Sequence, residues 1–113
     1  MTLHAEKCEP CRLGGAPLPD EEVQPLAATL PGWSVTANKL ERELVFKDFR
    51  TAMTFVNRVA DLANQEDHHP DLFISYNRVR LTLFTHKTGG LSRNDFILAA
   101  KIDRLMEHPG QDE

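Results

Sequence analysis

Hydrophobic residues recur along the chain with two spacings, one typical of helices and one typical of strands. Apolar positions three and four residues apart predict three helices, at residues 20–30, at 49–65 and after Ser92. Extended patterns bounded by turn residues predict four strands, at 33–35, 40–47, 72–76 and 79–85. The order α-β-β-α-β-β-α indicates an α+β fold, in which a four-stranded antiparallel sheet carries three helices on one face.

Capping and breaking residues mark the ends of the predicted helices. Asp20, Asp48 and Ser92 precede the three helices, and each is a residue type favoured at the N-cap. Pro70 disfavours helical backbone at the residue before it. The long helix should therefore end before His69, and the chain should then become extended.

The last predicted strand has one apolar side and one mixed side. The apolar side consists of Val79, Leu81 and Leu83, with Thr85 at its end. The other side carries Arg80, Thr82, Phe84 and His86. We expect the apolar side to face the helices.

Length and charge restrict the class of protein. The 113 residues suit one domain, expected at 18–108, with a flexible N-terminal tail at 1–17 and a C-terminal tail at 109–113. The net charge of −4 argues against direct binding to nucleic acid, which favours a basic surface. No apolar run approaches the ~20 residues that span a bilayer, and the first residues lack the apolar core of a signal peptide. We therefore expect a soluble, cytoplasmic protein with no membrane partner.

The expected tail contains two cysteines in a Cys-x-x-Cys spacing, Cys8 and Cys11. Two cysteines so close together do not form the disulfide framework of a secreted domain. The spacing suits zinc with His4 nearby, but three ligands fall short of a closed four-ligand site. An exposed dithiol in a flexible segment is the simpler interpretation.

Three histidines and one aspartate fall where predicted elements meet. His68 and His69 lie at a junction between helix and strand, His86 follows a strand, and Asp95 lies in the first turn of the last helix. Histidine titrates near neutral pH, so two of them supply an acid and a base at the same pH. A dehydration needs this combination, because one group protonates the departing hydroxyl and another accepts a proton from the neighbouring nitrogen.

Each of these residues also has a simpler interpretation. Adjacent histidines before a proline are compatible with a solvated turn, and Asp95 follows Ser92 by the three residues of a capping box. Zinc bound by all three histidines is a further alternative, although adjacent residues on an extended segment point to opposite sides. Trp33 is a residue for the core or an interface, or alternatively a wall for a flat heterocycle.

Several runs of residues together resemble the pterin-4a-carbinolamine dehydratases. The runs are Glu66-Asp67-His68-His69-Pro70, Tyr76-Asn77-Arg78-Val79, Leu83-Phe84-Thr85-His86 and Gly90-Leu91-Ser92-Arg93-Asn94-Asp95. Gly32-Trp33 and Phe46-Lys47-Asp48-Phe49 agree as well, so the resemblance covers about residues 18–108. The two cysteines lie outside it.

The resemblance implies the removal of water from 4a-hydroxytetrahydropterin to give quinonoid dihydropterin, which recycles the pterin of aromatic amino acid hydroxylases. It implies that His68 and His86 are acid–base catalysts, that His69 chiefly binds substrate, and that Asp95 supports the site. Asp67 and Trp33 are further candidates for contact with the pterin. The resemblance implies no metal and no organic cofactor. It also implies a homodimer or homotetramer in which sheets or helices of neighbouring subunits pair.

One position departs from the family pattern. Four residues before His68 the family usually carries an ionisable residue, and this chain has Asn64. An amide holds no charge, so we expect any electrostatic tuning of His68 from this position to be lost, with Glu66 and Asp67 as nearby substitutes.

Two other functions remain open from the sequence. The first is a non-catalytic adaptor, because members of the family also act as dimerisation cofactors of a transcription factor, and degenerate relatives assist the assembly of other proteins. The intact set of His68, His69, His86 and Asp95 argues against that role here. A metal-dependent hydrolase is a weaker alternative.

Overall fold

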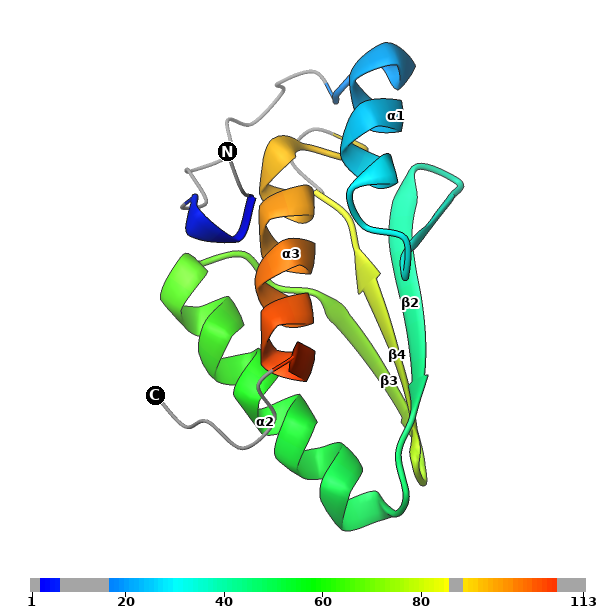
Figure 1. Cartoon of the computed structure of the whole chain (residues 1–113), viewed down its shortest axis with the longest axis vertical. Helices are drawn as coiled ribbons and strands as arrows, with labels where there is room; N and C mark the ends of the chain where they lie inside the picture. Colours follow the sequence, from blue (N-terminus) through cyan, green and yellow to red (C-terminus); the bar gives the residue numbers. More distant parts are fainter. Residues whose placement is uncertain (1–2, 7–16, 86–88, 108–113) are drawn as a thin grey trace.

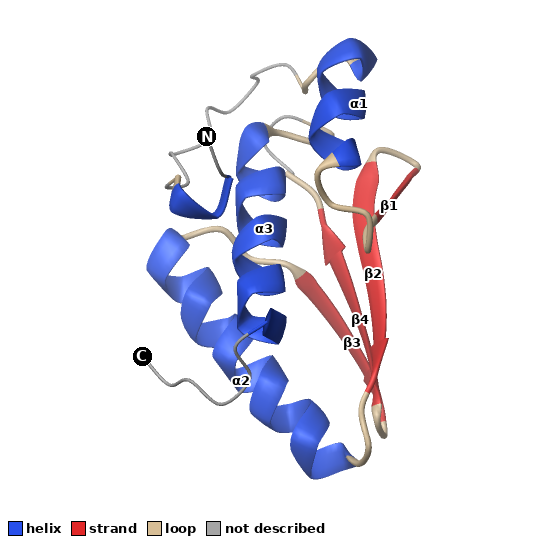
Figure 2. Ribbon diagram, in the orientation of Figure 1, coloured by secondary structure: helices blue, strands red, loops and turns tan. Residues whose placement is uncertain are grey.

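Three α-helices alternate with two pairs of strands in this computed structural model, in the order that the hydrophobic pattern predicts (Figures 1 and 2). The structure describes residues 3–6, 17–85 and 89–107. The elements are η1 (Leu3–Ala5), α1 (Asp20–Ala28), β1 (Ser34–Thr36), β2 (Lys39–Val45), α2 (Phe49–Glu66), β3 (Asp71–Ser75), β4 (Arg78–Leu83) and α3 (Arg93–Glu107). The expected α+β fold is therefore confirmed, and the short 3-10 helix η1 is an addition to it.

The four strands form one antiparallel sheet in the order β1-β2-β4-β3. Leu40 on β2 pairs with Leu83 on β4, and two residues further along Arg42 pairs with Leu81. Because side chains alternate across a strand, this register places both leucines of β4 on the side that faces the helices. Figure 2 shows all three α-helices on that side of the sheet, as predicted.

The core lies between the helices and the sheet, and α3 contributes more buried side chains than any other element. Phe96, Leu98 and Ile102 are fully buried, as are Val79 and Leu81 of β4. Burying an aliphatic or aromatic side chain of this size contributes about 1.5–3 kcal/mol to folding. Within the described part of the chain, no helix is long and apolar enough to cross a membrane.

The structure confirms the predicted N-cap of α2 but not that of α1. Asp48 caps α2 as expected, because its Oδ1 accepts the backbone N–H of Thr51 at 2.8 Å. The prediction for Asp20 is wrong, since Pro19 is the N-cap and Asp20 is the first residue of α1. Pro19 has the extended backbone that this position requires, and the carboxylate of Asp20 instead lies in the first turn, where the helix dipole favours negative charge.

The segment around η1 is in contact with α3. Lys101 Nζ donates to the carbonyl oxygen of His4 at 3.0 Å, and Arg93 makes two hydrogen bonds to the carboxylate of Glu6, at 2.9 and 2.7 Å. Residues 3–6, expected within the N-terminal tail, thus lie against the last helix. Cys8 and Cys11 lie outside the described residues.

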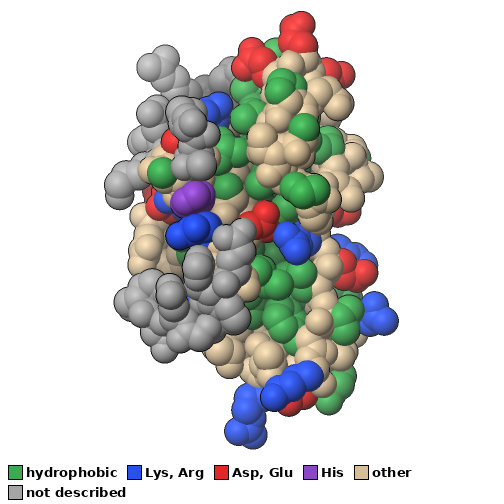
Figure 3. Space-filling model, in the orientation of Figure 1, with side chains coloured by type: hydrophobic (Ala, Val, Ile, Leu, Met, Phe, Trp, Pro, Cys, Tyr) green, Lys and Arg blue, Asp and Glu red, His purple; other side chains and the backbone are tan. Residues whose placement is uncertain are grey.

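An apolar hollow lies where the first turns of α2 approach the end of α3. Its walls include Phe46, Phe55, Leu105 and Met106. Figure 3 shows hydrophobic side chains gathered at the surface between the lower part of α3 and the sheet. The opposite end of α3, where Asp95 lies, is polar and carries the candidate site.

Candidate functional site

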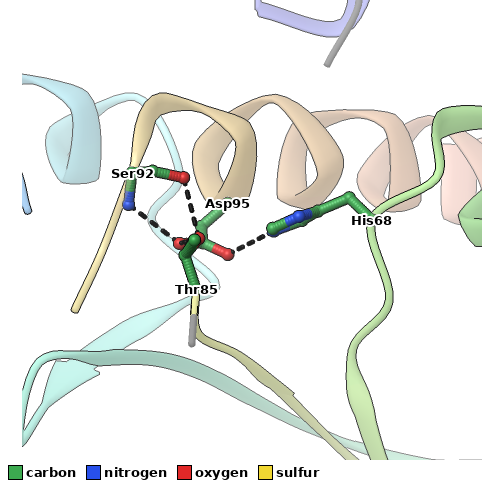
Figure 4. A network of polar contacts seen from close by, with 4 residues as sticks. All are labelled: His68, Thr85, Ser92 and Asp95. Atoms are coloured by element: carbon green, nitrogen blue, oxygen red, sulfur yellow. Dashed lines mark hydrogen bonds and ion pairs between the residues drawn. The ribbon is translucent and has the colours of Figure 1, made fainter. Parts of the chain in front are cut away.

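His68 and Asp95 form a buried pair at the junction of α2, β3 and α3 (Figure 4). The Nε2 atom of His68 lies 2.6 Å from Oδ1 of Asp95. Asp95 is completely buried, and His68 is only 8% exposed. A buried carboxylate is tolerated when it is fully hydrogen-bonded, so the surroundings of Asp95 decide how this pair is held.

The turn after α2 directs His68 inward. Asp67 follows the helix in the left-handed backbone region, with φ 53° and ψ 38°, and ends it as its C-cap. The N–H of His68 donates to the carbonyl oxygen of Ala63 at 3.2 Å, which holds the turn against the last part of the helix. Helix α2 thus ends at Glu66, before His69 and Pro70, as the sequence predicts.

The second oxygen of Asp95 is held by two donors. The Thr85 hydroxyl donates to Oδ2 at 2.7 Å, and the Ser92 backbone N–H donates to the same atom at 2.9 Å. The hydroxyls of Thr85 and Ser92 lie 2.8 Å apart (Figure 4). Each oxygen of the carboxylate therefore has a partner, and the side chain is fixed at both ends.

Asp95 combines the two roles that the sequence left open. The bond from the Ser92 N–H to Asp95 is one half of a capping box, in which a residue three positions into the helix accepts from the residue before the helix. The opposite oxygen of the same carboxylate contacts His68. One side chain thus caps α3 and orients a histidine, and its place in the first turn suits a negative charge.

His69 is exposed and has a different partner from its neighbour. Its Nε2 lies 3.0 Å from Oδ1 of Asn64, and because an amide oxygen accepts, the ring nitrogen donates. Asn64 therefore contacts His69, although its place in the sequence suggested an effect on His68. The two histidines point to different environments, one buried against Asp95 and one open to solvent.

The remaining candidates lie in several places. Trp33 is buried, and its Nε1 donates to Asp103 Oδ1 at 2.9 Å, an atom that also accepts from Arg42 at 2.7 Å. Asp67 is exposed beside the two histidines. Tyr76 lies at the β3–β4 turn, at the opposite end of β3 from His69. The positions of Trp33 and Tyr76 are therefore distinct from the pair of His68 and Asp95.

His86 lies outside the described residues, and it directly follows Thr85 in the chain. In the described ranges, no group of three His, Cys, Asp or Glu side chains is arranged to hold a metal ion.

Sequence reasoning did not identify Thr85 as part of the site. Thr85 is 3% exposed and lies two residues after the end of β4, where it continues the apolar alternation of Leu81 and Leu83. A buried hydroxyl needs a hydrogen-bond partner. A threonine at the end of a row of apolar side chains is therefore the sequence signal that could have identified Thr85.

Comparisons with known proteins show which family the sequence resembles. The family model described as "Pterin 4 alpha carbinolamine dehydratase" matches residues 16–105. A protein of Rubrobacter xylanophilus whose name assigns it to the pterin-4-alpha-carbinolamine dehydratases is 49% identical over 107 residues, which cover 93% of this chain and 100% of the relative. A similarly named protein of Nitrosomonas eutropha is 48% identical over 105 residues, which cover 92% and 93% of the two chains.

The fold is also similar to a solved structure. A crystal structure from Brucella melitensis, described as a transcriptional coactivator/pterin dehydratase, superimposes with a TM-score of 0.75 at 35% identity. The match covers 79% of this chain and 97% of that one.

Proposed function

The chain belongs to the pterin 4 alpha carbinolamine dehydratase family, and from this membership we propose that it removes water from a 4a-hydroxytetrahydropterin. In this reaction the bond between C4a and its hydroxyl breaks, and N5 loses its proton. The products are quinonoid dihydropterin and water. The reaction is a hydro-lyase step that needs one acid and one base, with no change of oxidation state.

His68 and His86 are the proposed acid–base pair. The observation that carries this proposal is the bond between His68 Nε2 and Asp95 Oδ1 at 2.6 Å in a buried position. A carboxylate that holds one ring nitrogen fixes the orientation of the imidazole and leaves the other nitrogen for proton transfer. His86 is proposed as the second group from the resemblance, and it follows Thr85 of the same network.

His69 is proposed to bind the pterin. It is exposed next to His68, and Asn64 fixes its ring by a hydrogen bond at 3.0 Å. Asp67 is a further proposed contact, since it is exposed in the same turn. No organic cofactor and no metal is part of the proposed step.

The physiological setting is also a proposal. We expect recycling of the pterin used by an aromatic amino acid hydroxylase, in the cytoplasm. A homodimer or homotetramer is expected, and β3 offers a free sheet edge with Phe73 55% exposed on it. Light scattering after size-exclusion chromatography measures this state directly.

The decisive experiment is a stopped-flow assay with freshly formed 4a-carbinolamine. The full chain should accelerate formation of the quinonoid product. His68→Ala and His86→Ala should each lower the rate by about 10²–10⁴-fold, while their circular dichroism spectra remain those of a folded protein. Wild-type protein that leaves the uncatalysed rate unchanged would falsify the proposal.

A second candidate function is a protein adaptor, because the Brucella melitensis structure is described as a coactivator as well as a dehydratase. This alternative is favoured if the chain forms a stable complex with a protein partner and shows no pterin turnover. His68→Ala should then leave the complex unaffected.

A further inference from the structure

We propose that Thr85 is a positioning residue, whose hydroxyl holds Asp95 so that His68 carries its proton on Nε2 and presents Nδ1 to the pterin. The catalytic part of this inference rests on the proposed function. The protonation pattern of His68 is a property of the folded protein alone, and it can be measured without turnover.

The direction of each hydrogen bond follows from the number of hydrogens available. Thr85 has one hydroxyl hydrogen, and it is donated to Oδ2 of Asp95 at 2.7 Å. In the contact of 2.8 Å between the two hydroxyls, Ser92 must therefore be the donor and Thr85 the acceptor. The hydrogen bonds run in one direction, from Ser92 through Thr85 to the carboxylate.

This arrangement determines which way the Asp95 carboxylate faces. One oxygen, Oδ2, accepts from both the Thr85 hydroxyl and the Ser92 N–H, so any rotation that tilts the carboxylate out of its present plane would stretch both bonds. Oδ1 is thereby directed at His68 as an acceptor, and an acceptor at 2.6 Å requires a hydrogen on Nε2. The hydrogen bond at one ring nitrogen fixes the state of the other, so Nδ1 is the nitrogen available to take up or return a proton.

The backbone places Thr85 rigidly enough for this role. Its N–H donates to the carbonyl oxygen of Gly90 at 3.1 Å, and the N–H of Gly89 donates to its carbonyl oxygen at 3.0 Å. Thr85 is also 3% exposed. A side chain of the same shape can therefore replace Thr85 without a change in backbone course, which allows the hydroxyl to be tested by itself.

The experiment compares Thr85→Val, which keeps the shape and removes the hydroxyl, with Thr85→Ser, which keeps the hydroxyl. Thr82→Val is the matched control, because Thr82 lies on β4, three residues before Thr85, and its hydroxyl contacts Glu41 at 3.4 Å instead of Asp95. The first measurement is the ¹⁵N spectrum of the His68 ring, assigned by its disappearance in His68→Gln. The second is kcat and KM for the carbinolamine.

Wild-type protein, Thr85→Ser and Thr82→Val should show a single His68 tautomer with the hydrogen on Nε2. Thr85→Val should show a mixture of the two tautomers, with kcat lowered by about tenfold and KM unchanged. A Thr85→Val protein with the wild-type His68 spectrum overturns the proposal, and so does a Thr85→Ser protein that resembles Thr85→Val.

Failure of a variant to fold and absence of turnover in the wild-type chain have separate consequences. If valine at position 85 prevents folding, Thr85→Ala removes the same hydroxyl with a smaller side chain and is judged by the same spectrum. If the wild-type chain does not turn over the carbinolamine, the proposed function fails, while the ring spectra still decide the role of Thr85.

Discussion

The Nε2 atom of His68 lies 2.6 Å from Oδ1 of Asp95, although 27 residues separate them in the sequence. The contact joins the turn after α2 to the first turn of α3, and both side chains are buried. Such a pair stabilises the fold and restricts the imidazole at the same time. Substitutions that separate the two effects are therefore the most informative.

His68→Gln should abolish most turnover while it preserves more stability than His68→Ala. The amide of glutamine can donate to Asp95, whereas alanine leaves a buried carboxylate oxygen without its donor, at a cost of about 1–3 kcal/mol. Both variants lack an imidazole, so both should be slow in the carbinolamine assay. Urea denaturation measures the difference in stability. Equal stabilities for the two variants would contradict the proposed importance of the bond to Asp95.

Asp95→Asn should lower both stability and turnover. If the amide oxygen still accepts from Thr85 and the Ser92 N–H, the NH2 group faces Nε2 of His68, which is itself a donor, so one buried contact is lost at about 1–3 kcal/mol. Asp103→Asn is a matched control, since it makes the same chemical change on the same helix beside Trp33 and Arg42. Thermal unfolding and stopped-flow turnover should show that both variants lose stability and only Asp95→Asn becomes slow.

Asn64→Ala should raise KM for the pterin severalfold with little change in kcat. The substitution removes the hydrogen bond at 3.0 Å that holds the His69 ring, and His69 is proposed chiefly to bind the substrate. Gln65→Ala is the control, because Gln65 is the exposed neighbour on the same helix. Steady-state kinetics across a range of pterin concentrations measures both constants. A fall in kcat at constant KM would assign His69 to the chemical step.

Asp48 should give the stability of the chain a dependence on pH in the acid range. The backbone N–H of Thr51 holds the pKa of Asp48 below its ordinary value of 3.8. A lowered pKa means that the stabilisation is fully present above the ordinary value and is lost as the pH falls through the folded value. Asp48→Asn keeps a capping side chain that does not titrate.

The measurement for this prediction is the urea midpoint of wild type and Asp48→Asn between pH 6 and pH 2. Wild type should be the more stable protein at pH 6, and the difference should shrink below pH 4. A difference that stays constant over this range would show that Asp48 caps α2 without a contribution from its charge.

Trp33→Phe should lower the free energy of unfolding by about 1–3 kcal/mol and leave KM for the pterin unchanged. The indole Nε1 donates to Asp103 in a buried position, and phenylalanine cannot replace this bond. Denaturation and steady-state kinetics on the same sample test both statements. A raised KM with unchanged stability would instead support the candidate role of Trp33 as a wall of the pterin site.

The order of the elements was predictable because helices and strands leave local patterns in the sequence. The spacing of apolar residues and the effect of Pro70 on His69 both act within a few residues, and both predictions hold. Asp20 failed as a cap for an equally local reason, since Pro19 has the required extended backbone one residue earlier.

The site was predictable only where single residues carried the signal. His68 and Asp95 were identified by residue type, but their contact depends on how α2 and α3 pack against the sheet. The hydroxyl of Thr85 and the partnership of Asn64 with His69 depend on the same packing. Side-chain contacts between distant segments leave no periodic trace in one sequence, and this part of the site had to come from the structure.

The contact of η1 with α3 has a consequence for how the chain matures. His4 and Lys101 are 97 residues apart, so their hydrogen bond closes almost the whole chain into a loop. Chains are synthesised from the N-terminus, so η1 emerges from the ribosome long before Lys101 exists. A nascent chain that has not yet reached Lys101 lacks this contact, so η1 can dock on the helix that carries Asp95 only after Lys101 has been synthesised.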